Sequence, residues 1–313
     1  MVLREPAGRL DDHAQLDPVR LLRLGEGQRL LLAREVALAA LLDQFHVPTL
    51  PVDHSYEHNF HTLQGMPEFD SNGIRLHYVL AGPEDGRPIL LVHGFCSDYE
   101  LNWVGTRWQQ TLTDAGFLVL GLDCRGHGHS DKPHDPAAYD RMQMALDAVS
   151  LLDHLDIADA DYLGYSMGAR IGLHVCLEHG SRVGKAVLGG SGLPSGPGRA
   201  DLIAARLRGD ESVTDEGAVM FYTFAAARPI NDLEALACCI LGPHEAISEE
   251  QLASIELPIA VVAGDDDPIA RTAPELARAL GSGRYYPLPG RNHMNAVPAR
   301  QFKAAALEFL AER

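Results

Sequence analysis

The amino-acid sequence predicts an α/β protein with a mostly parallel sheet that helices cover on both faces. From residue 69 onward, short and nearly continuous apolar segments alternate with helical patterns, which is typical of parallel strands buried on both faces. Residues 193–256 interrupt this alternation with helical patterns alone, and another helical pattern precedes it. We therefore predict a helical cap inserted between two strands and a helical extension at the N-terminus.

The N-terminal extension is predicted to occupy residues 1–65, as helices followed by a linker. Apolar residues recur at helical spacing in residues 17–47, and the break at Gly25 and Gly27 indicates two amphipathic helices. The most apolar part, residues 30–42, carries two charged residues and is too short to cross a bilayer. Its apolar stripe must be buried, so we expect it to dock on the protein itself or to form a homodimer.

The linker contains residues that resemble metal ligands by type only. A segment flanked by prolines does not hold side chains on one helical face, and the sequence supplies no further ligand cluster. We therefore expect no metal and no cofactor, and we interpret the linker side chains as surface groups: His54, Glu57, His58 and His61.

The sheet itself is expected to divide into two parts, residues 66–192 and residues 257–313, on either side of a cap at 193–256. After a hairpin arm at 74–82, apolar segments predict strands at 88–94, 117–123, 160–166, 184–191, 258–264 and 284–290. Helical patterns at 141–157 and 272–280 separate some of them. In such sheets, binding residues gather where the carboxyl ends of the strands meet.

Composition excludes several classes of partner. The chain has 26 Lys and Arg against 43 Asp and Glu, a net charge of −17, and no basic patch, so nucleic acid is not expected to bind. No signal-peptide pattern and no membrane span is recognised. Five scattered cysteines fit reduced thiols in the cytoplasm, and we expect Cys96 to be a buried structural thiol.

The segment DYLGYSMGARIG, residues 161–172, places Ser166 between Gly164 and Gly168 where a strand gives way to a helix. A sharp strand-to-helix turn needs small neighbours and exposes the serine hydroxyl beside a helix N-terminus, which stabilises developing negative charge. The same five residues also fit an ordinary helix entry with Ser166 as the N-cap. The rest of the chain has to decide between the two.

Other strand ends carry groups that complete a catalytic set. His93, Gly94 and Phe95 follow one strand, three consecutive carboxylates follow another, and His293 follows the last. Serine, acid and histidine in this chain order, at one rim of a sheet, favour nucleophilic catalysis. Spacing alone does not separate the carboxylates, which are Asp265, Asp266 and Asp267.

From these motifs the sequence resembles the α/β-hydrolase superfamily, as a serine esterase-like member with a short helical cap. The resemblance covers about residues 69–312. It rests on HGF at 93–95, LDCRGHGHSDKP at 122–133, GYSMG at 164–168, GDDDP at 264–268 and GRNH at 290–293. It implies the α/β-hydrolase fold, and it is more specific for that fold than for a substrate.

The resemblance also implies roles for single residues. The family pattern G-x-x-D, placed on Gly264, selects Asp267 as the acid, with Asp266 as the alternative. His93 is expected to organise its turn. In relatives, the loop at 122–133 secures the sheet rim through Arg125 and Asp131, so a structural role is expected for His127 and His129.

These residues predict an acyl-enzyme mechanism. Ser166 attacks a carbonyl carbon while His293, oriented by Asp267, takes its proton, and water then hydrolyses the acyl-enzyme. The backbone N–H groups of Phe95 and Met167 are expected to form the oxyanion hole.

The candidate lining of the acyl pocket is aromatic: Trp103, Phe221, Tyr222 and Phe224. Helical spacing makes core packing an equal alternative for each of them. Bulky walls predict a small pocket and a preference for short acyl chains, without binding to a lipid interface.

The leading hypothesis is a serine hydrolase of small carboxylic esters or lactones, whose expected partner, besides a second copy of the chain if the extension forms a homodimer, is a small-molecule substrate. An alternative is hydrolysis of a carbon–carbon bond beside a ketone, for which the cap offers Arg199, Arg206, Arg208 and Arg228 as carboxylate anchors. A non-catalytic binding protein is a further alternative, which the intact Ser166, Asp267 and His293 disfavour. Dehalogenases and epoxide hydrolases of this fold use an aspartate at the position of Ser166.

Overall fold

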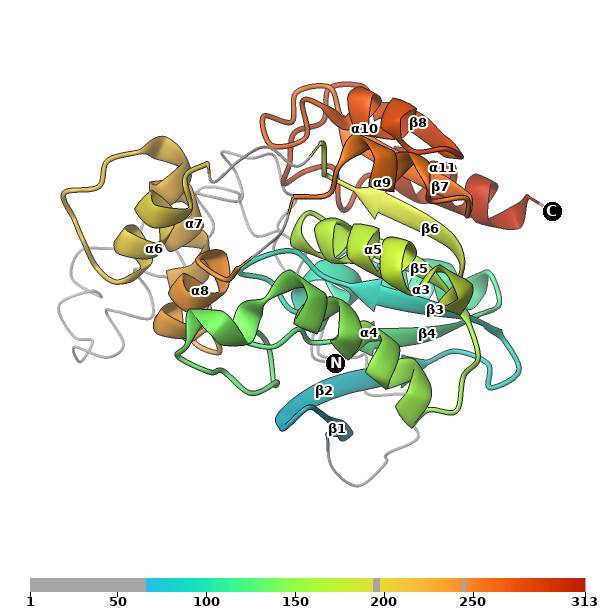
Figure 1. Ribbon diagram of the computed structural model, residues 1–313, viewed down its shortest axis with the longest axis horizontal. Coiled ribbons are helices and arrows are strands. Elements are labelled where there is room, and N and C mark those ends of the chain that lie inside the picture. The colour runs from blue at the N-terminus through green and yellow to red at the C-terminus, as the bar shows by residue number, and fades with distance from the viewer. Residues whose placement is uncertain (1–65, 194–197, 244–245, 313) are drawn as a thin grey trace, which may run out of the picture.

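The computed structural model describes residues 66–193, 198–243 and 246–312. In Figure 1 these residues form a sheet between helices, with a group of further helices beyond one end of the sheet. The predicted extension at 1–65 lies outside the described residues. Its helices, the linker side chains from His54 to His61 and the proposed dimer contact therefore stay predictions.

The sheet has eight strands in the order β1-β2-β4-β3-β5-β6-β7-β8, which confirms the predicted fold class. β2 pairs antiparallel with β1 and with β4, and all other neighbours are parallel. The bounds are β1 Glu68–Ser71, β2 Ile74–Ala81, β3 Arg87–Val92, β4 Phe117–Leu122, β5 Ala160–Tyr165, β6 Val183–Gly189, β7 Ile259–Gly264 and β8 Gly283–Leu288.

The central strands are apolar at nearly every position because both faces of the sheet are covered. In β3, Ile89 and Leu91 point into one core cluster, whereas Leu90 and Val92 point into the other. Successive side chains of a strand lie on opposite faces, so a strand between two helical layers loses the polar half of the usual alternation. This is why an apolar run, rather than an alternating one, predicted these strands.

Helices α4, α5 and α10 cover one face of the sheet, and α3 and α11 cover the other. Their bounds are α3 Trp108–Asp114, α4 Arg141–His154, α5 Met167–Glu178, α10 Ala273–Ala279 and α11 Arg300–Ala311. α4 begins where the carboxylate of Asp140 accepts the N–H groups of Met142 and Gln143.

The insertion between β6 and β7 contains helices and, in its described residues, no strand. It includes α6 Ala200–Leu207, α7 Glu216–Ala226 and α8 Leu233–Ile240, which pack on one another at the end of the sheet (Figure 1). The fourth helix, α9 Glu249–Ala253, lies instead beside α10, and its Leu252 is buried in the same core cluster as Leu276. The three helices that pack together as the cap thus end at Ile240, whereas we predicted that the cap insertion ends at residue 256.

Within the part of the chain that the structure describes, no helix combines the length and apolar character needed to cross a membrane. The same residues contain no group of three His, Cys, Asp or Glu side chains arranged to hold a metal ion.

Candidate active site

The turn between β5 and α5 places Ser166 in a strained backbone conformation, with φ 53° and ψ −107°. A positive φ is uncommon for residues other than glycine and costs free energy, so it persists only where the surroundings impose it. The Ser166 N–H donates to the carbonyl of Gly189 over 2.8 Å. Its hydroxyl makes no capping bond to α5, which argues against the alternative of a simple N-cap.

The two glycines around Ser166 are required by close packing. A Cβ on Gly168 would lie 2.0 Å from the carbonyl oxygen of Val92 in β3. A Cβ on Gly164 would lie 2.4 Å from the carbonyl oxygen of Gly168. Real Cβ atoms do not approach this closely, so the strand, the turn and the helix can only pack together here without side chains.

His293 lies between Ser166 and Asp267. Its Nε2 is 3.0 Å from the Ser166 hydroxyl oxygen, and its Nδ1 is 2.8 Å from Oδ2 of Asp267. An Nδ1 that donates to the carboxylate leaves the lone pair of Nε2 directed at the hydroxyl. The arrangement can therefore remove the hydroxyl proton as the oxygen attacks an electrophile.

Among the three consecutive carboxylates, only Asp267 is buried, with 2% of its surface exposed. Its Oδ1 accepts the N–H groups of Ile269 (2.8 Å) and Ala270 (3.2 Å), which leaves Oδ2 for the histidine. Asp265 and Asp266 are exposed, and Asp265 accepts the N–H of Gly290 over 2.7 Å.

A tyrosine that the sequence did not single out also holds the histidine. The hydroxyl of Tyr165 donates to the backbone carbonyl of His293 over 2.5 Å, and the two rings are 5.2 Å apart. Burial, reinforced by the charge of Asp267, raises the pKa of Tyr165 well above its usual range, so the phenol remains a neutral donor. The only signal in the sequence is that Tyr165 directly precedes the serine.

The loop after β3 lies against the serine. A Cβ on Gly94 would be 3.6 Å from the Cβ of Ser166, so the backbone of this loop passes beside Ser166. Within the described residues, the N–H groups of Phe95 and Met167 donate to no other group. Both are free for an external acceptor, which is what an oxyanion hole needs.

His93 and His127 hold this loop through both ring nitrogens. Nδ1 of His93 bonds to the carbonyl of Gly94 (2.8 Å), and its Nε2 accepts the N–H of Cys124 (3.0 Å). His127 bonds in the same way to the carbonyl of Arg125 (3.0 Å) and the N–H of Cys96 (3.2 Å). Burial lowers the pKa of His127 to about 3, which keeps the ring neutral. His93 and His127 therefore have a structural role. The side chain of His129, by contrast, is exposed.

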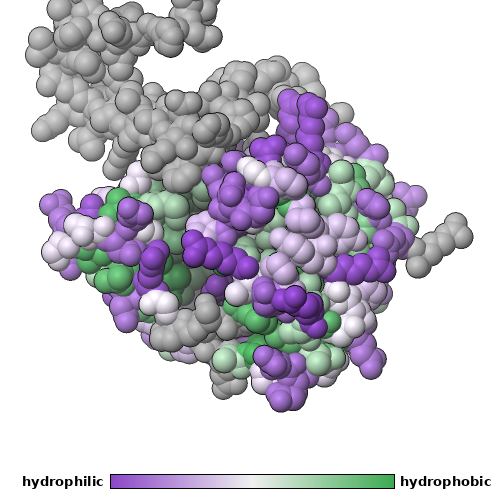
Figure 2. Space-filling view, turned by 90° about the horizontal axis from the view of Figure 1, so that it is seen from above, coloured by the Kyte–Doolittle hydropathy of each residue, from purple (hydrophilic) through white to green (hydrophobic). Residues whose placement is uncertain are grey.

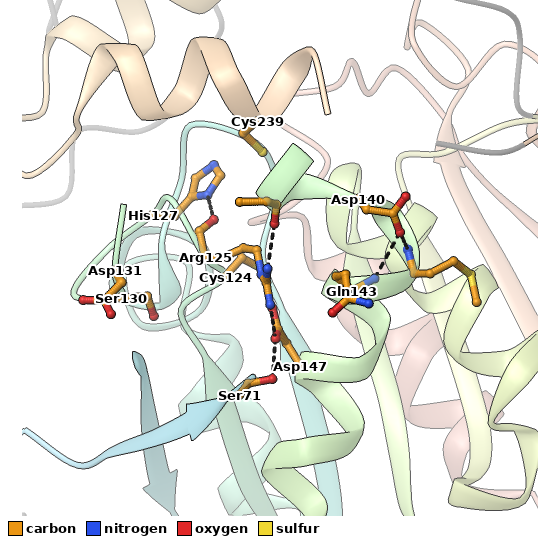
Figure 3. A network of polar contacts seen from close by, with 12 residues as sticks. Ser71, Cys124, Arg125, His127, Ser130, Asp131, Asp140, Gln143, Asp147 and Cys239 are labelled. Atoms are coloured by element: carbon orange, nitrogen blue, oxygen red, sulfur yellow. Dashed lines mark hydrogen bonds and ion pairs between the residues drawn. The ribbon is translucent and has the colours of Figure 1, made fainter. Parts of the chain in front are cut away.

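Arg125 and Asp131, through which the resemblance secures the rim, bond to separate partners, and the partner of Arg125 is a carboxylate of α4. Its guanidinium makes two bonds of 2.7 Å to Asp147, whose Oδ1 also accepts the hydroxyl of Ser71 over 2.6 Å (Figure 3). Asp131 pairs instead with Arg75 at 3.0 Å. The loop is therefore tied to α4 and β1 through one aspartate and to β2 through the other.

The four candidate pocket residues separate in the structure. Phe221 of the cap lies edge-to-face on Phe95, with ring centroids 5.5 Å apart. Tyr222 lies under the guanidinium of Arg206 at 5.0 Å. Phe224 is partly buried against the core. Figure 2 shows hydrophobic residues set back behind hydrophilic ones on the cap side of the upper face.

Trp103 does not line accessible space, and we correct its assignment. Its side chain has no exposed surface and packs edge-to-face on Trp108, at 6.1 Å, in the core under α3 and α11. Helical spacing places a residue on a buried face without showing whether that face borders a pocket or the core.

All five cysteines are free and buried, as expected for Cys96. Burial raises the pKa of Cys176 and of Cys239 to about 12, and it also raises the pKa of Cys96 and Cys124. No thiol therefore competes with Ser166 as a nucleophile within the described residues.

Comparison with known proteins supports the assignment of the fold. Residues 87–211 match the family model described as alpha/beta hydrolase fold. The solved enol-lactonase of Burkholderia xenovorans superposes with a TM-score of 0.67 at 26% identity, over 79% of this chain and all of that one.

Several curated relatives are hydrolases, and they are of different kinds. The 3-oxoadipate enol-lactonase 2 of Acinetobacter baylyi is 29% identical over 64% of this chain and 79% of its own length. A haloalkane dehalogenase of Mycolicibacterium paratuberculosis is 35% identical over 40% of this chain. The chain spans less than half the length of the haloalkane dehalogenases that it matches.

Proposed function

Because the chain belongs to the α/β-hydrolase superfamily, we propose that it is a serine hydrolase of small carboxylic esters or lactones. One observation carries the proposal: His293 bridges Ser166 and Asp267, with 3.0 Å to the hydroxyl oxygen and 2.8 Å to the carboxylate. A serine hydroxyl is a weak nucleophile until a base in this position takes its proton.

The proposed reaction has two halves. Ser166 Oγ adds to the carbonyl carbon as its proton moves to Nε2 of His293, and the oxyanion accepts the N–H groups of Phe95 and Met167. The histidine then gives the proton to the leaving alkoxide, which departs and leaves an ester of Ser166. Water, deprotonated by the same nitrogen, adds to that ester, and its collapse releases the acid and restores the serine.

Serine chemistry distinguishes this proposal from the activities of some relatives. Attack of a serine on an alkyl halide or an epoxide would form an ether, which water at this site would not hydrolyse. An aspartate in its place would form an ester with the same substrates, and water can hydrolyse that ester to restore the aspartate. Since Ser166 holds the nucleophile position, the enol-lactonase relatives are the better guides, and they support including lactones among the substrates.

No observation favours the alternative of carbon–carbon bond hydrolysis. A substrate carboxylate would need an unpaired cation, but three of the four cap arginines already pair with a carboxylate of the protein, and Arg206 is held by an aromatic ring and a backbone carbonyl. The partners are Asp215 for Arg199, the ring of Tyr222 and the carbonyl of Asp210 for Arg206, Glu234 for Arg208, and Asp98 for Arg228.

The pocket and the compartment are part of the same proposal. The contact between Phe221 and Phe95 narrows the space beside the oxyanion loop, which supports short acyl groups. Five free thiols support a reducing compartment such as the cytoplasm.

Two measurements on the full chain test the proposal. A fluorophosphonate probe should label the wild-type protein but not Ser166→Ala, because the probe needs an activated serine. A panel of p-nitrophenyl esters and simple lactones should then be hydrolysed by the wild type and not by the variant. A wild-type protein that neither reacts with the probe nor cleaves any ester would show that the triad is not active.

A further inference from the structure

The connection between the cap helices α7 and α8 contacts the loop that carries Phe95. The side-chain amide of Asn231 donates to the backbone carbonyl of Cys96 over 3.2 Å. The guanidinium of Arg228 forms an ion pair with Asp98. Both partners lie within three residues of Phe95, so the cap bonds directly to the proposed oxyanion loop.

These contacts fix the loop to the cap as a unit. The amide of Asn231 donates a second bond to the carbonyl of Ala225 in α7 over 3.1 Å, which holds the side chain against the end of the preceding helix. The Arg228 pair is shielded, because 4% of the Asp98 side chain and 25% of the Arg228 side chain are exposed. By contrast, the Arg208–Glu234 pair on the cap surface is 40% and 41% exposed. Removing one partner of a shielded pair leaves an uncompensated charge, whereas an exposed pair contributes little.

Asp98 passes this restraint on to the other side of Phe95. Its Oδ1 accepts the N–H of Leu101 over 2.8 Å, and its backbone carbonyl accepts the N–H of Asn102 over 2.9 Å. Oδ1 of Asn102 in turn accepts the N–H of Gly94 over 3.1 Å. A continuous series of polar contacts therefore runs from Arg228 of the cap through Asp98 and Asn102 to Gly94, the residue before Phe95.

The peptide that carries the Phe95 N–H is oriented by its own carbonyl. The Gly94 carbonyl is bonded by Nδ1 of His93 at 2.8 Å and by the N–H of Ser97 at 3.2 Å. Because a peptide group is planar and trans, fixing this carbonyl directs the Phe95 N–H to the opposite side.

The loop needs external support because one of its residues is strained. Cys96 has φ 62°, in the left-handed region that residues other than glycine rarely adopt. Its N–H is held by His127 and its carbonyl by Asn231. Strained backbone of this kind persists where several contacts impose it, and one of those contacts comes from the cap.

We propose that Arg228 and Asn231 are positioning residues, through which the docked cap sets the direction of the Phe95 N–H toward the oxyanion. The inference rests on the proposed serine-hydrolase function for what that N–H does. It gives the cap a part in transition-state stabilisation as well as in enclosing the substrate. Neither residue touches the reacting atoms.

Steady-state kinetics with p-nitrophenyl acetate test this inference. Arg228→Gln and Asn231→Ala should each lower kcat at least about tenfold and change KM less than about twofold, since a displaced oxyanion donor acts mainly in the transition state. Arg228→Lys should recover part of the loss. Arg208→Gln, the matched control on the cap surface, should leave kcat unchanged.

Two further measurements separate positioning from general damage. A thionoester, whose sulfur makes poor use of an oxyanion hole, should lose less rate than the ester in Arg228→Gln and Asn231→Ala, and the pH profile of kcat should keep its shape. The double variant Asp98→Asn/Arg228→Gln should lose less than the product of the two single losses, because it leaves no unpaired charge. If Arg228→Gln does not fold, Asn231→Ala and the double variant provide the same readouts.

The outcomes are distinct. If the wild-type enzyme is active and kcat of Arg228→Gln and of Asn231→Ala stays within twofold of the wild-type value, the positioning role is overturned and the proposed function is left intact. Equal losses for ester and thionoester also overturn it. A wild type that fails to hydrolyse esters and to react with a fluorophosphonate overturns both.

Discussion

Nε2 of His293 lies 3.0 Å from the hydroxyl oxygen of Ser166, although 127 positions separate the two residues in the chain. Ser166 follows β5 and His293 follows β8, so the parallel sheet carries both to the same edge. Asp267 follows β7 and completes the set. The contact between Ser166 and His293 thus follows from the order of the parallel strands. Substitutions of Ser166, His293 and Asp267 can test the role of each residue separately.

Replacing any member of the triad should remove activity without unfolding the protein. Ser166→Ala and His293→Ala should each lower kcat/KM for a short ester by about 10⁴-fold or more, because the residues act as one unit. Asp267→Asn should cost orders of magnitude, since an amide at that position no longer favours the required tautomer. Asp265→Asn and Asp266→Asn serve as exposed controls and should cost less than about threefold. A severe loss in Asp266→Asn with none in Asp267→Asn would transfer the role of the acid.

Acid should destabilise the fold through His127. Burial lowers the pKa of His127 to about 3 in the folded state, whereas an unfolded histidine titrates near about 6.5. Below about 6.5 the unfolded chain binds a proton that the folded chain does not, so stability falls by about 1.4 kcal/mol per pH unit until about pH 3. Between pH 6.5 and pH 5 this amounts to about 2 kcal/mol.

Urea unfolding at pH 7.5 and pH 5 measures this effect. His127→Gln should show a smaller difference between the two pH values than the wild type, whereas His129→Gln, at an exposed position, should behave like the wild type. Asp123 does not interfere. Burial opposes its ionisation, but hydrogen bonds from His77, Tyr99 and His129 lower its pKa to about 2, so its contribution is constant above about pH 4. An unchanged pH dependence in His127→Gln would contradict the assignment.

The buried thiols should be inert in the native protein. Burial raises the pKa of Cys176 and Cys239 to about 12, so less than about one thiol in a thousand is ionised at pH 8. Ellman's reagent should therefore react slowly with the folded protein and with five thiols after denaturation. Activity should survive the treatment. Rapid loss of activity would place a reactive cysteine near the proposed oxyanion donors and would point to Cys96, beside Phe95, or to Cys239, whose sulfur lies 3.9 Å from that of Met167.

The strands and the tight turn at Ser166 could be predicted from the sequence because both leave local signals. A strand covered on both faces reads as an apolar run, and the close approach of Gly168 to Val92 requires glycines around Ser166. Spacing could not choose among the consecutive aspartates, because what distinguishes Asp267 is burial and two backbone N–H donors. Only the family pattern singled it out.

Contacts between distant segments left no local signal. The partner of Arg125 is Asp147, and nothing in the spacing shows which carboxylate of a later helix will face the guanidinium. The ion pair between Arg228 and Asp98 joins residues 130 positions apart, across the boundary between cap and core. Such pairs follow from how the cap docks, which depends on the whole surface rather than on a motif.

The last prediction concerns substrate size and the ring of Phe221. This ring lies 5.5 Å from that of Phe95, whose N–H we propose as an oxyanion donor, so we expect it to border the acyl group of a bound substrate. Wild-type enzyme should prefer p-nitrophenyl acetate or butyrate to the decanoate, because extra methylenes find no room to be buried. Phe221→Ala should raise the ratio of kcat/KM for octanoate over acetate by about tenfold, which corresponds to about two newly buried methylenes at about 0.8 kcal/mol each. Tyr222→Ala is the matched control, since the Tyr222 ring packs under Arg206, and it should leave the ratio unchanged. A wild-type optimum at decanoate or longer would mean that the cap opens a channel past Phe221 and that the enzyme acts on lipid-like esters.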